Sequence, residues 1–279
     1  MLGADRVELL GLHFDAVTMD QAVERCLSLV EGARAPHLVV TANASHLCMM
    51  RSDDELARAC QGGALTLADG MSVVWALRAA GEAVPERVAG VDLMEALLAA
   101  GGGKGLRVYF LGARPEVVAR LVAVVSQNHP GIVIAGFRDG YFKACDHEAV
   151  VEEIRASNAD MLFVGMPTPF KEVWCARHME RLDVPVIMGV GGSFDVLAGF
   201  IRRAPQLMRA LGLEWFWRLL MEPRKLWKRY LVTNAQFIGL AAISVLTRRL
   251  RRLSPHAGAK QQPRAKQQPR AKEQAGTSA

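Results

Sequence analysis

Six short apolar runs, rich in β-branched residues, recur along this chain of 279 residues, and stretches with helical periodicity separate them. This alternation predicts an α/β fold with a Rossmann-like, mostly parallel sheet and helices on both faces. A small hairpin over residues 7–17 and a helix over 19–30 are expected before the first run. The expected strands are 37–41, 64–68, 107–111, 131–135, 161–164 and 184–188, and the clearest helices are 115–128, 146–156 and 170–181.

Charge divides the chain into unlike parts. Residues 1–201 hold 17 Lys and Arg against 25 Asp and Glu, whereas residues 202–252 hold 12 against 2. We therefore predict an α/β catalytic domain over 1–201 and a basic, aromatic-rich helical appendage over 202–253, which suits a polyanionic partner. The remaining residues, 254–279, repeat Lys-Gln-Gln-Pro-Arg-Ala and are predicted to form a disordered tail.

The composition of the appendage favours an anionic membrane surface over a nucleic acid. Three of the five tryptophans lie there among arginines, a combination typical of the lipid headgroup region. The stretch 231–247 is too apolar for a nucleic-acid surface, so we expect no nucleic-acid partner. Its length and its polar residues Asn234 and Gln236 favour a helix lying in the interface over one crossing the bilayer.

Two further features suggest a cytoplasmic protein. The five cysteines form no CxxC pair and no regular framework, as expected of reduced thiols. The first residues lack the basic segment and apolar stretch of a secretory signal. Together with the basic appendage, these features predict a peripheral protein on the inner face of the plasma membrane.

Polar residues follow the first two expected strands, at the end where open parallel sheets bind their ligands. Thr41 ends the first strand, Asn43 follows it, and Asp69 follows the second strand. A carboxylate there is a candidate general base for an attacking hydroxyl, and an amide is a candidate hydrogen-bond partner of the substrate. Arg87, in the loop opened by Pro85, is a solvated residue by default and a diphosphate ligand if it points toward the site.

These residues also have structural interpretations, which the sequence alone favours. Asp69 and Asn43 stand at positions typical of helix N-caps, and Thr41 at the last position of a strand. Asp92 is interpreted as the cap of a helix over residues 93–100. His46, one turn after Asn43, is expected to be structural.

The glycine-rich segment Gly189-Val-Gly-Gly-Ser193 lacks the dinucleotide fingerprint, because Phe194 stands where the third glycine belongs. This disfavours a Rossmann-type oxidoreductase. Gly191 and Gly192 are still candidates for phosphate contact through main-chain amides at a helix N-terminus. No Walker A sequence and no metal-ligand spacing occur, so we expect neither a metal nor another cofactor.

Several motifs occur in a fixed order between about residues 7 and 230. They are Thr41-Ala-Asn-Ala-Ser-His-Leu47, Ala68-Asp-Gly-Met71, Glu86-Arg-Val-Ala-Gly-Val-Asp92, Val190-Gly-Gly-Ser-Phe-Asp195, Arg203-Ala-Pro205, Leu213-Glu-Trp215 and Glu222-Pro-Arg224. Together they resemble the bacterial WecG/TagA/CpsF glycosyltransferases (glycosyltransferase family 26). The resemblance implies inverting transfer of a sugar, usually from a UDP-linked donor, to a polyprenyl-diphosphate-linked acceptor sugar in cell-surface polysaccharide biosynthesis.

The resemblance also implies roles for individual residues. Asp69 corresponds to the proposed base, and Thr41 and Asn43 to a pair that lines the same pocket. Arg87 corresponds to an arginine that meets the leaving diphosphate or the acceptor phosphate. The appendage is implied to bring basic residues to the membrane and to the lipid diphosphate. Our candidates there are Arg218, Arg224 and Arg229.

One segment departs from the family pattern. Many relatives carry Gly-x-Gly-x-Pro-Lys-Gln-Glu after the fifth strand, whereas this chain reads Gly165-Met-Pro-Thr-Pro-Phe-Lys-Glu172. Lys171 thus stands where glutamine is common, and a cation replaces a hydrogen-bonding residue. We keep Lys171 as a candidate donor-binding residue and expect a different nucleotide or sugar, such as an acidic one.

The sequence therefore predicts a peripheral membrane glycosyltransferase, similar to N-acetylmannosaminyltransferases. The alternative is a non-catalytic scaffold that binds nucleotide sugars within a membrane assembly complex, which the presence of Asp69 disfavours. Self-association into a homo-oligomer is left open.

Overall fold

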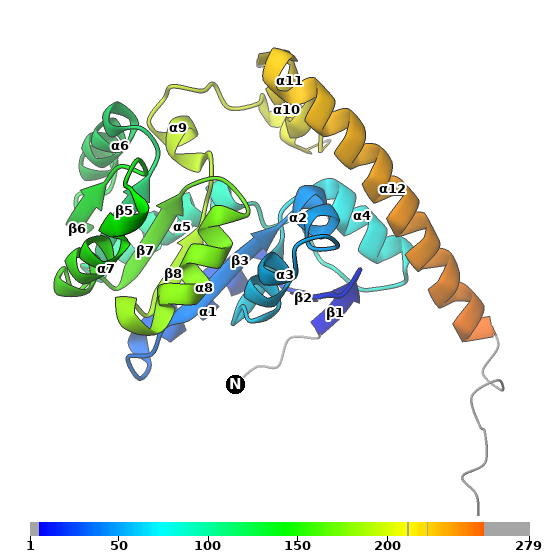
Figure 1. Ribbon diagram of the computed structural model, residues 1–279, viewed down its shortest axis with the longest axis horizontal. Helices are drawn as coiled ribbons and strands as arrows, with labels where there is room; N and C mark the ends of the chain where they lie inside the picture. Colours follow the sequence, from blue (N-terminus) through cyan, green and yellow to red (C-terminus); the bar gives the residue numbers. More distant parts are fainter. Residues whose placement is uncertain (1–5, 211, 222, 254–279) are drawn as a thin grey trace, which may run out of the picture.

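A six-stranded parallel sheet forms the centre of the protein (Figure 1). The computed structural model describes residues 6–210, 212–221 and 223–253. The strand order is β4–β3–β8–β7–β5–β6, and each neighbouring pair is parallel. The predicted α/β fold and its six strands are confirmed, with small shifts in their bounds. The strands are β3 (His37–Ala42), β4 (Leu65–Ala68), β5 (Arg107–Gly112), β6 (Val133–Arg138), β7 (Met161–Gly165) and β8 (Val186–Gly189).

Two apolar cores cover the two faces of the sheet. Successive side chains of a strand point to opposite faces. In β5, Val108 and Phe110 therefore enter one core, and Tyr109 and Leu111 enter the other. This explains why the central strands are continuous apolar runs, since a parallel sheet covered on both sides has no polar face.

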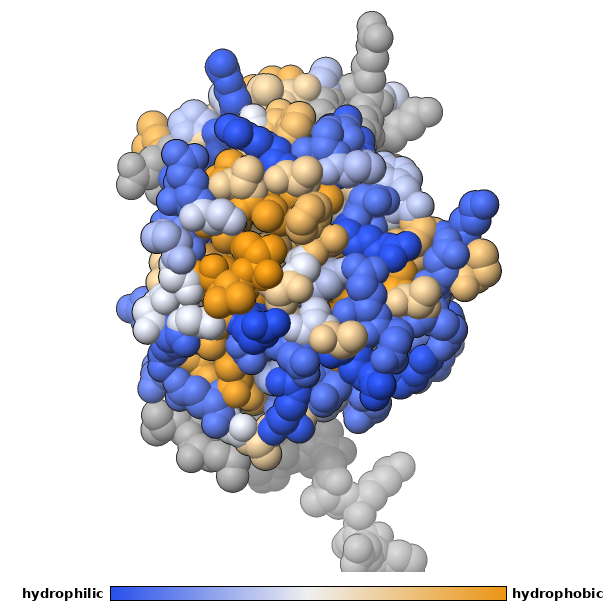
Figure 2. All heavy atoms as spheres, turned by 90° about the vertical axis from the view of Figure 1, so that its left-hand side faces the viewer, coloured by the Kyte–Doolittle hydropathy of each residue, from blue (hydrophilic) through white to orange (hydrophobic). Residues whose placement is uncertain are grey.

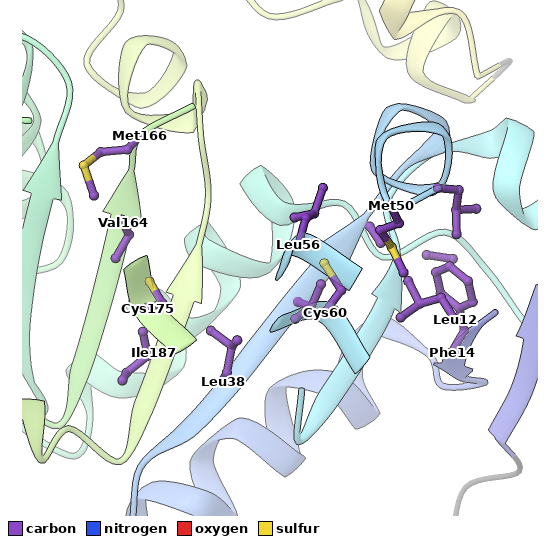
Figure 3. Close-up of a cluster of buried hydrophobic side chains, with 14 of the residues drawn as sticks. Leu12, Phe14, Leu38, Met50, Leu56, Cys60, Val164, Met166, Cys175 and Ile187 are labelled. Atoms are coloured by element: carbon purple, nitrogen blue, oxygen red, sulfur yellow. The ribbon is translucent and has the colours of Figure 1, made fainter. Parts of the chain in front are cut away.

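Helices cover each core from outside (Figure 1). One core lies under α1 (Met19–Glu31), α5 (Gly90–Gly102), α6 (Pro115–Asn128) and α9 (Ser193–Leu197). The other, part of which is shown in Figure 3, lies under α2 (Ala44–Met49), α3 (Asp54–Gln61), α4 (Met71–Ala79), α7 (His147–Ala156) and α8 (Phe170–Leu182). A short 3₁₀ turn, η1 (Ala144–Asp146), precedes α7.

An antiparallel hairpin precedes the sheet, as predicted. It consists of β1 (Arg6–Leu9) and β2 (Leu12–Asp15), and its apolar side chains complete the second core. The helix α1 then begins after Thr18. The Thr18 hydroxyl accepts the Gln21 amide, and the Gln21 side chain accepts the Thr18 amide. This capping box sets the start of the helix.

The C-terminal segment contains α10 (Gln206–Ala210), α11 (Glu214–Met221) and α12 (Pro223–Leu253). The long helix α12 packs against α2 and α4, and it buries Phe237 and Ala241 in the second core. No helix in the described part of the chain combines the length and apolar character needed to cross a membrane. The predicted tail, residues 254–279, lies outside the described residues.

The outer surface of this segment carries many apolar side chains. They are at least two-fifths exposed and include Trp215, Phe216, Leu220, Trp227, Val232, Ile238, Ile243 and Leu246. A second apolar surface lies at the opposite side of the molecule, which Figure 2 faces. The edge strand β6 exposes Val133 and Phe137 there.

Candidate functional site

Most of the sequence-predicted site residues gather where β4, β3 and β8 end. These strands are neighbours in the sheet and run in the same direction, so their carboxyl ends lie together. The main chain joins the loops that follow. The Asp69 amide donates to the Ala42 carbonyl over 2.9 Å, and the Val88 amide donates to the Ala68 carbonyl over 3.1 Å. We call this place the strand-exit site, and its residues are Thr41, Asn43, Asp69, Arg87 and Gly189–Gly192.

Asp69 lies between β4 and α4 and is partly exposed. The N-cap of α4 is Gly70, which makes no side-chain cap bond, so the interpretation of Asp69 as a cap is wrong. Gly70 has a φ of +151°, a conformation that favours glycine. The chain therefore turns into the helix on Gly70, and Asp69 precedes this turn at the end of β4.

Asn43 is the N-cap of α2, as its structural interpretation predicted. Its Oδ1 accepts the amides of Ser45 (2.9 Å) and His46 (3.4 Å). It also stands beside the turn that carries Asp69, because a Cβ at Gly70 would lie 3.7 Å from the Asn43 Cβ. Asn43 is therefore held by its own helix beside the turn that follows Asp69.

Thr41 lies at the end of β3, buried beneath the other residues of the strand-exit site. Its side chain is buried, and its hydroxyl donates to the Gly189 carbonyl over 3.4 Å. A Cβ added to Gly90, the first residue of α5, would lie only 3.0 Å from the Thr41 Oγ1. The hydroxyl thus ties β3 to the end of β8 and packs under α5.

Lys171 belongs to a buried polar cluster between α2 and α8. Its ammonium donates to Thr168 Oγ1 over 2.5 Å and forms an ion pair with Glu172. The same Glu172 Oε1 accepts from His46 Nε2 over 2.8 Å and from Thr168 Oγ1 over 3.1 Å. The side chains of His46, Lys171 and Glu172 are only 5–6% exposed. Lys171 thus has its charge balanced inside the protein, and His46 is structural, as predicted.

Glu172 is ionised in this cluster. Burial by itself raises the pKa of Glu172, but the hydrogen bond from His46 and the charge of Lys171 outweigh it and lower the pKa to about 2. A carboxylate with a lowered pKa stabilises the fold above the pKa of its unfolded form. That contribution is lost as the pH falls toward the folded-state pKa.

Replacing Glu172 by Gln should therefore destabilise the protein at neutral pH, by about 3–5 kcal/mol, because it leaves the Lys171 charge buried without its partner. The difference in unfolding free energy from wild type should shrink between about pH 4.5 and pH 2, where wild type itself loses the ionised form. Urea unfolding at several pH values measures both. The exposed Glu152→Gln variant is the control, and a difference that stays constant down to pH 2.5 would contradict the expectation.

Arg87 is largely buried and lies between two carboxylates. It pairs with Glu214 of α11 over 2.5 Å and with Asp92 of α5 over 3.4 Å, and its side chain is 14% exposed. The interpretation as a solvated loop residue is therefore wrong. The guanidinium instead connects the strand-exit site to the C-terminal segment.

Asp92 is the centre of this connection. Its interpretation as a helix cap is wrong, because α5 begins at Gly90 and Asp92 lies inside the first turn. Its carboxylate forms an ion pair with Arg203 and lies 3.9 Å from Arg209. Burial, with Arg209 and Arg87 nearby, lowers the pKa of Arg203. Three arginines and their carboxylates thus hold the C-terminal segment against the α/β unit.

Packing brings the same segment close to Asp69. A Cβ at Gly212, between α10 and α11, would lie 2.5 Å from the Met71 Cγ in the first turn of α4.

The residues Arg203, Glu214 and Glu172 received no role in the sequence analysis. Their only signal was their position within or beside the recognised motifs.

The glycine-rich loop lies at the end of β8. Gly191 has a φ of +53°, which glycine adopts without strain, and a Cβ there would meet nothing closer than 3.9 Å. The amide of Gly191 donates to the Val164 carbonyl over 3.3 Å, and Gly192 is the N-cap of α9. The loop therefore leaves space above the main chain at Gly191.

The other predicted residues lie in the C-terminal segment. Arg218 belongs to α11, and Arg224 and Arg229 belong to α12, but their side chains lie outside the described part of the structure. Within the described residues, no group of three or more His, Cys, Asp or Glu side chains is placed to hold a metal ion.

Proteins of similar sequence include known glycosyltransferases. Two curated relatives carry the name N-acetylglucosaminyldiphosphoundecaprenol N-acetyl-β-D-mannosaminyltransferase. The protein from Bacillus subtilis is 38% identical, and the one from Bacillus spizizenii is 39% identical, each over 165 residues. The match covers 59% of this chain and 63% of each relative. A sequence profile of the WecG/TagA/CpsF family matches residues 7–252. The chain therefore belongs to the WecG/TagA/CpsF family of glycosyl transferases.

Proposed function

We propose that the protein transfers a sugar from a nucleotide diphosphate donor, with UDP as the expected nucleotide, to a polyprenyl-diphosphate-linked acceptor sugar. The reaction would belong to cell-surface polysaccharide biosynthesis. Family membership and the activity named for the two Bacillus relatives support this class of reaction. The observation that carries the proposal is the position of Asp69, a partly exposed residue that precedes the N-cap Gly70 and whose amide donates to the carbonyl of Ala42, the neighbour of Asn43.

The proposed mechanism is a single displacement with inversion at the anomeric carbon. Asp69 takes the proton of the acceptor hydroxyl as its oxygen attacks the donor sugar. The bond from the sugar to the nucleotide diphosphate breaks, and the nucleotide diphosphate leaves with its electron pair. Thr41 and Asn43 hold the substrate in line for this attack, which lowers the entropic part of the barrier.

Charge on the leaving diphosphate needs stabilisation. We assign this to Arg87 and to the main chain at Gly191 and Gly192, and Lys171 acts on the donor side of the site by packing against Gly189 in the same loop. For a phosphate to reach Arg87, Glu214 has to release one edge of the guanidinium. In the C-terminal segment, the lipid-linked diphosphate of the acceptor is assigned to Arg218, Arg224 and Arg229.

The function is tested by incubating the full chain with a panel of nucleotide sugars and a synthetic polyprenyl diphosphate that carries N-acetylglucosamine. Mass spectrometry should show the acceptor gaining one sugar, and the proton coupling at its anomeric carbon should show inversion. Tight donor binding without any product from the panel would overturn the proposal in favour of a nucleotide-sugar-binding scaffold.

We also propose that the C-terminal segment attaches the protein to anionic membranes. The full chain should sediment with vesicles that contain anionic lipids and much less with zwitterionic vesicles, and high salt should release it. Changing the four arginines at the end of α12 to Gln should weaken binding at least tenfold, since each contributes roughly 1 kcal/mol. These are Arg248, Arg249, Arg251 and Arg252.

A variant with the same change of charge elsewhere serves as the control. It replaces four exposed arginines of the α/β unit by Gln, and it should bind vesicles like wild type. The four are Arg58, Arg120, Arg155 and Arg181. Equal loss of binding in both variants would mean that overall charge, and not the end of α12, attaches the protein.

A further inference from the structure

The buried cluster around Glu172 contacts three segments that border the strand-exit site. Through His46 it reaches α2, which begins after Asn43. Through Thr168 it reaches the loop between β7 and α8. Through Lys171 it reaches the end of β8. The cluster does not touch Asp69 in any of these contacts, so its influence on the reaction is indirect.

His46 connects Glu172 to Asn43 through its two ring nitrogens. Glu172 is ionised and can only accept, so His46 Nε2 carries the hydrogen of their 2.8 Å bond. The other nitrogen, Nδ1, lies 3.3 Å from the main-chain amide of Asn43 and 3.1 Å from its Oδ1. Without a hydrogen, Nδ1 accepts from the amide, and with one it donates to Oδ1. A continuous chain of hydrogen bonds therefore runs from Glu172 through the imidazole to Asn43.

Lys171 supports the glycine-rich loop from below. A Cβ at Gly189 would lie 2.9 Å from the Lys171 Cε, so the aliphatic part of the lysine occupies the space that a side chain would need. The cavity beside it, lined in part by Thr41, Lys171 and Glu172, has a volume of about 10 Å³. That volume holds at most one water and no part of a nucleotide sugar.

We propose that Glu172 is a positioning residue for sugar transfer, which holds Asn43 through His46 and the Gly189–Gly192 loop through Lys171. This inference rests on the proposed function, because it assumes that these segments orient the substrates of Asp69. The imidazole of His46 fixes the position of the first turn of α2. The side chain of Lys171, paired with Glu172, fixes the position of the Gly189–Gly192 loop relative to the sheet. Small displacements of either segment would misalign the reacting atoms, and such errors cost up to about 10²-fold in rate.

The kinetic test compares Glu172→Gln, Lys171→Gln and the double variant. Glu172→Gln should lower kcat by roughly 10–100-fold and change the KM of the donor little, because orientation and not binding is lost. In the Lys171→Gln background no buried cation needs neutralising. The Glu172→Gln change should still lower kcat by a similar factor there, through its loss of control over His46. Recovery of the double variant to the activity of Lys171→Gln would overturn the positioning role.

A second variant and a spectroscopic measurement do not depend on the folding of Glu172→Gln. His46→Phe keeps a ring at this position but removes both the donor to Glu172 and the group that bonds to Asn43, and it should show the same loss of kcat. Unchanged kcat in this folded variant would also overturn the proposal. Nitrogen-15 NMR of the full wild-type chain should show a protonated Nε2 in His46, as its bond to the ionised Glu172 requires.

The NMR result separates failure of this inference from failure of the proposed function. An unprotonated Nε2 in His46 would overturn the inference even in an enzyme that transfers sugar at full rate. If wild type transferred no sugar at all, the proposed function would fail and the positioning role would fail with it, whatever the tautomer.

Discussion

Replacing Asp69 by Asn should reduce the kcat of sugar transfer by about 10²–10⁴-fold, the range that a positioned general base contributes. Asparagine has nearly the same shape and leaves the start of α4 intact, since Gly70 and not Asp69 is the N-cap. The binding of the donor nucleotide should therefore change little. The transfer assay measures the first quantity, and calorimetric titration with the nucleotide measures the second.

Asp53→Asn is the matched control. Asp53 is the N-cap of α3, and its Oδ1 accepts the amides of Glu55 (3.1 Å) and Leu56 (2.9 Å). Asparagine caps helices about as well as aspartate, so this variant should keep both fold and turnover. Turnover close to wild type in Asp69→Asn would remove the assignment of the base. A matching loss in Asp53→Asn would show that the effect is not specific to the strand-exit site.

Replacing Arg87 by Ala should lower kcat/KM by roughly 10–10²-fold, because charge-assisted hydrogen bonds contribute about 1.5–3 kcal/mol each. The same change also removes the ion pairs that Arg87 forms with Glu214 and Asp92. Their loss weakens the contact between the α/β unit and α11. Two causes, loss of a phosphate ligand and loss of an internal contact, would thus give the same kinetic result.

The Glu214→Gln variant distinguishes these causes. It removes the carboxylate that now occupies Arg87 and leaves the guanidinium more available to a diphosphate. If Arg87 binds phosphate, Glu214→Gln should retain or increase kcat/KM for the donor. If Arg87 serves only to hold α11, Glu214→Gln should reproduce most of the loss seen in Arg87→Ala, and our assignment would be wrong. Steady-state kinetics of the two variants and of Asp92→Asn provide the comparison.

Much of the fold was predictable because its signals are local. Each strand is a short apolar run, and Pro115 at the start of α6 and Thr18 before α1 mark helix starts in the sequence itself. The position of Asn43 as a cap followed from the same rules. The residues Asp69 and Arg87 were found through motifs that place them after strands.

What could not be predicted depends on contacts between distant parts of the chain. Asp92 resembles a cap locally, but its partner Arg203 is 111 residues away. Glu172 and His46 are 126 residues apart, and neither has a local pattern that indicates a buried pair. The start of α4 was misassigned because a glycine with positive φ took the position that aspartate usually occupies. The roles of these residues and the start of α4 depend on long-range ion pairs and on backbone conformation. The local helix and capping preferences of single residues do not determine them.

The strand order has a consequence for biosynthesis. β8 joins β3 on one side to β7 on the other, and it is the last strand of the sheet to leave the ribosome. Until then the nascent chain contains two separate blocks, β3–β4 and β5–β6–β7, each with an open hydrogen-bonding edge. The closing pairs, such as His37 with Val186, join residues far apart in sequence, which makes this step slow. Chaperones that shield strand edges would therefore act on this chain throughout the long interval between the synthesis of β3 and that of β8.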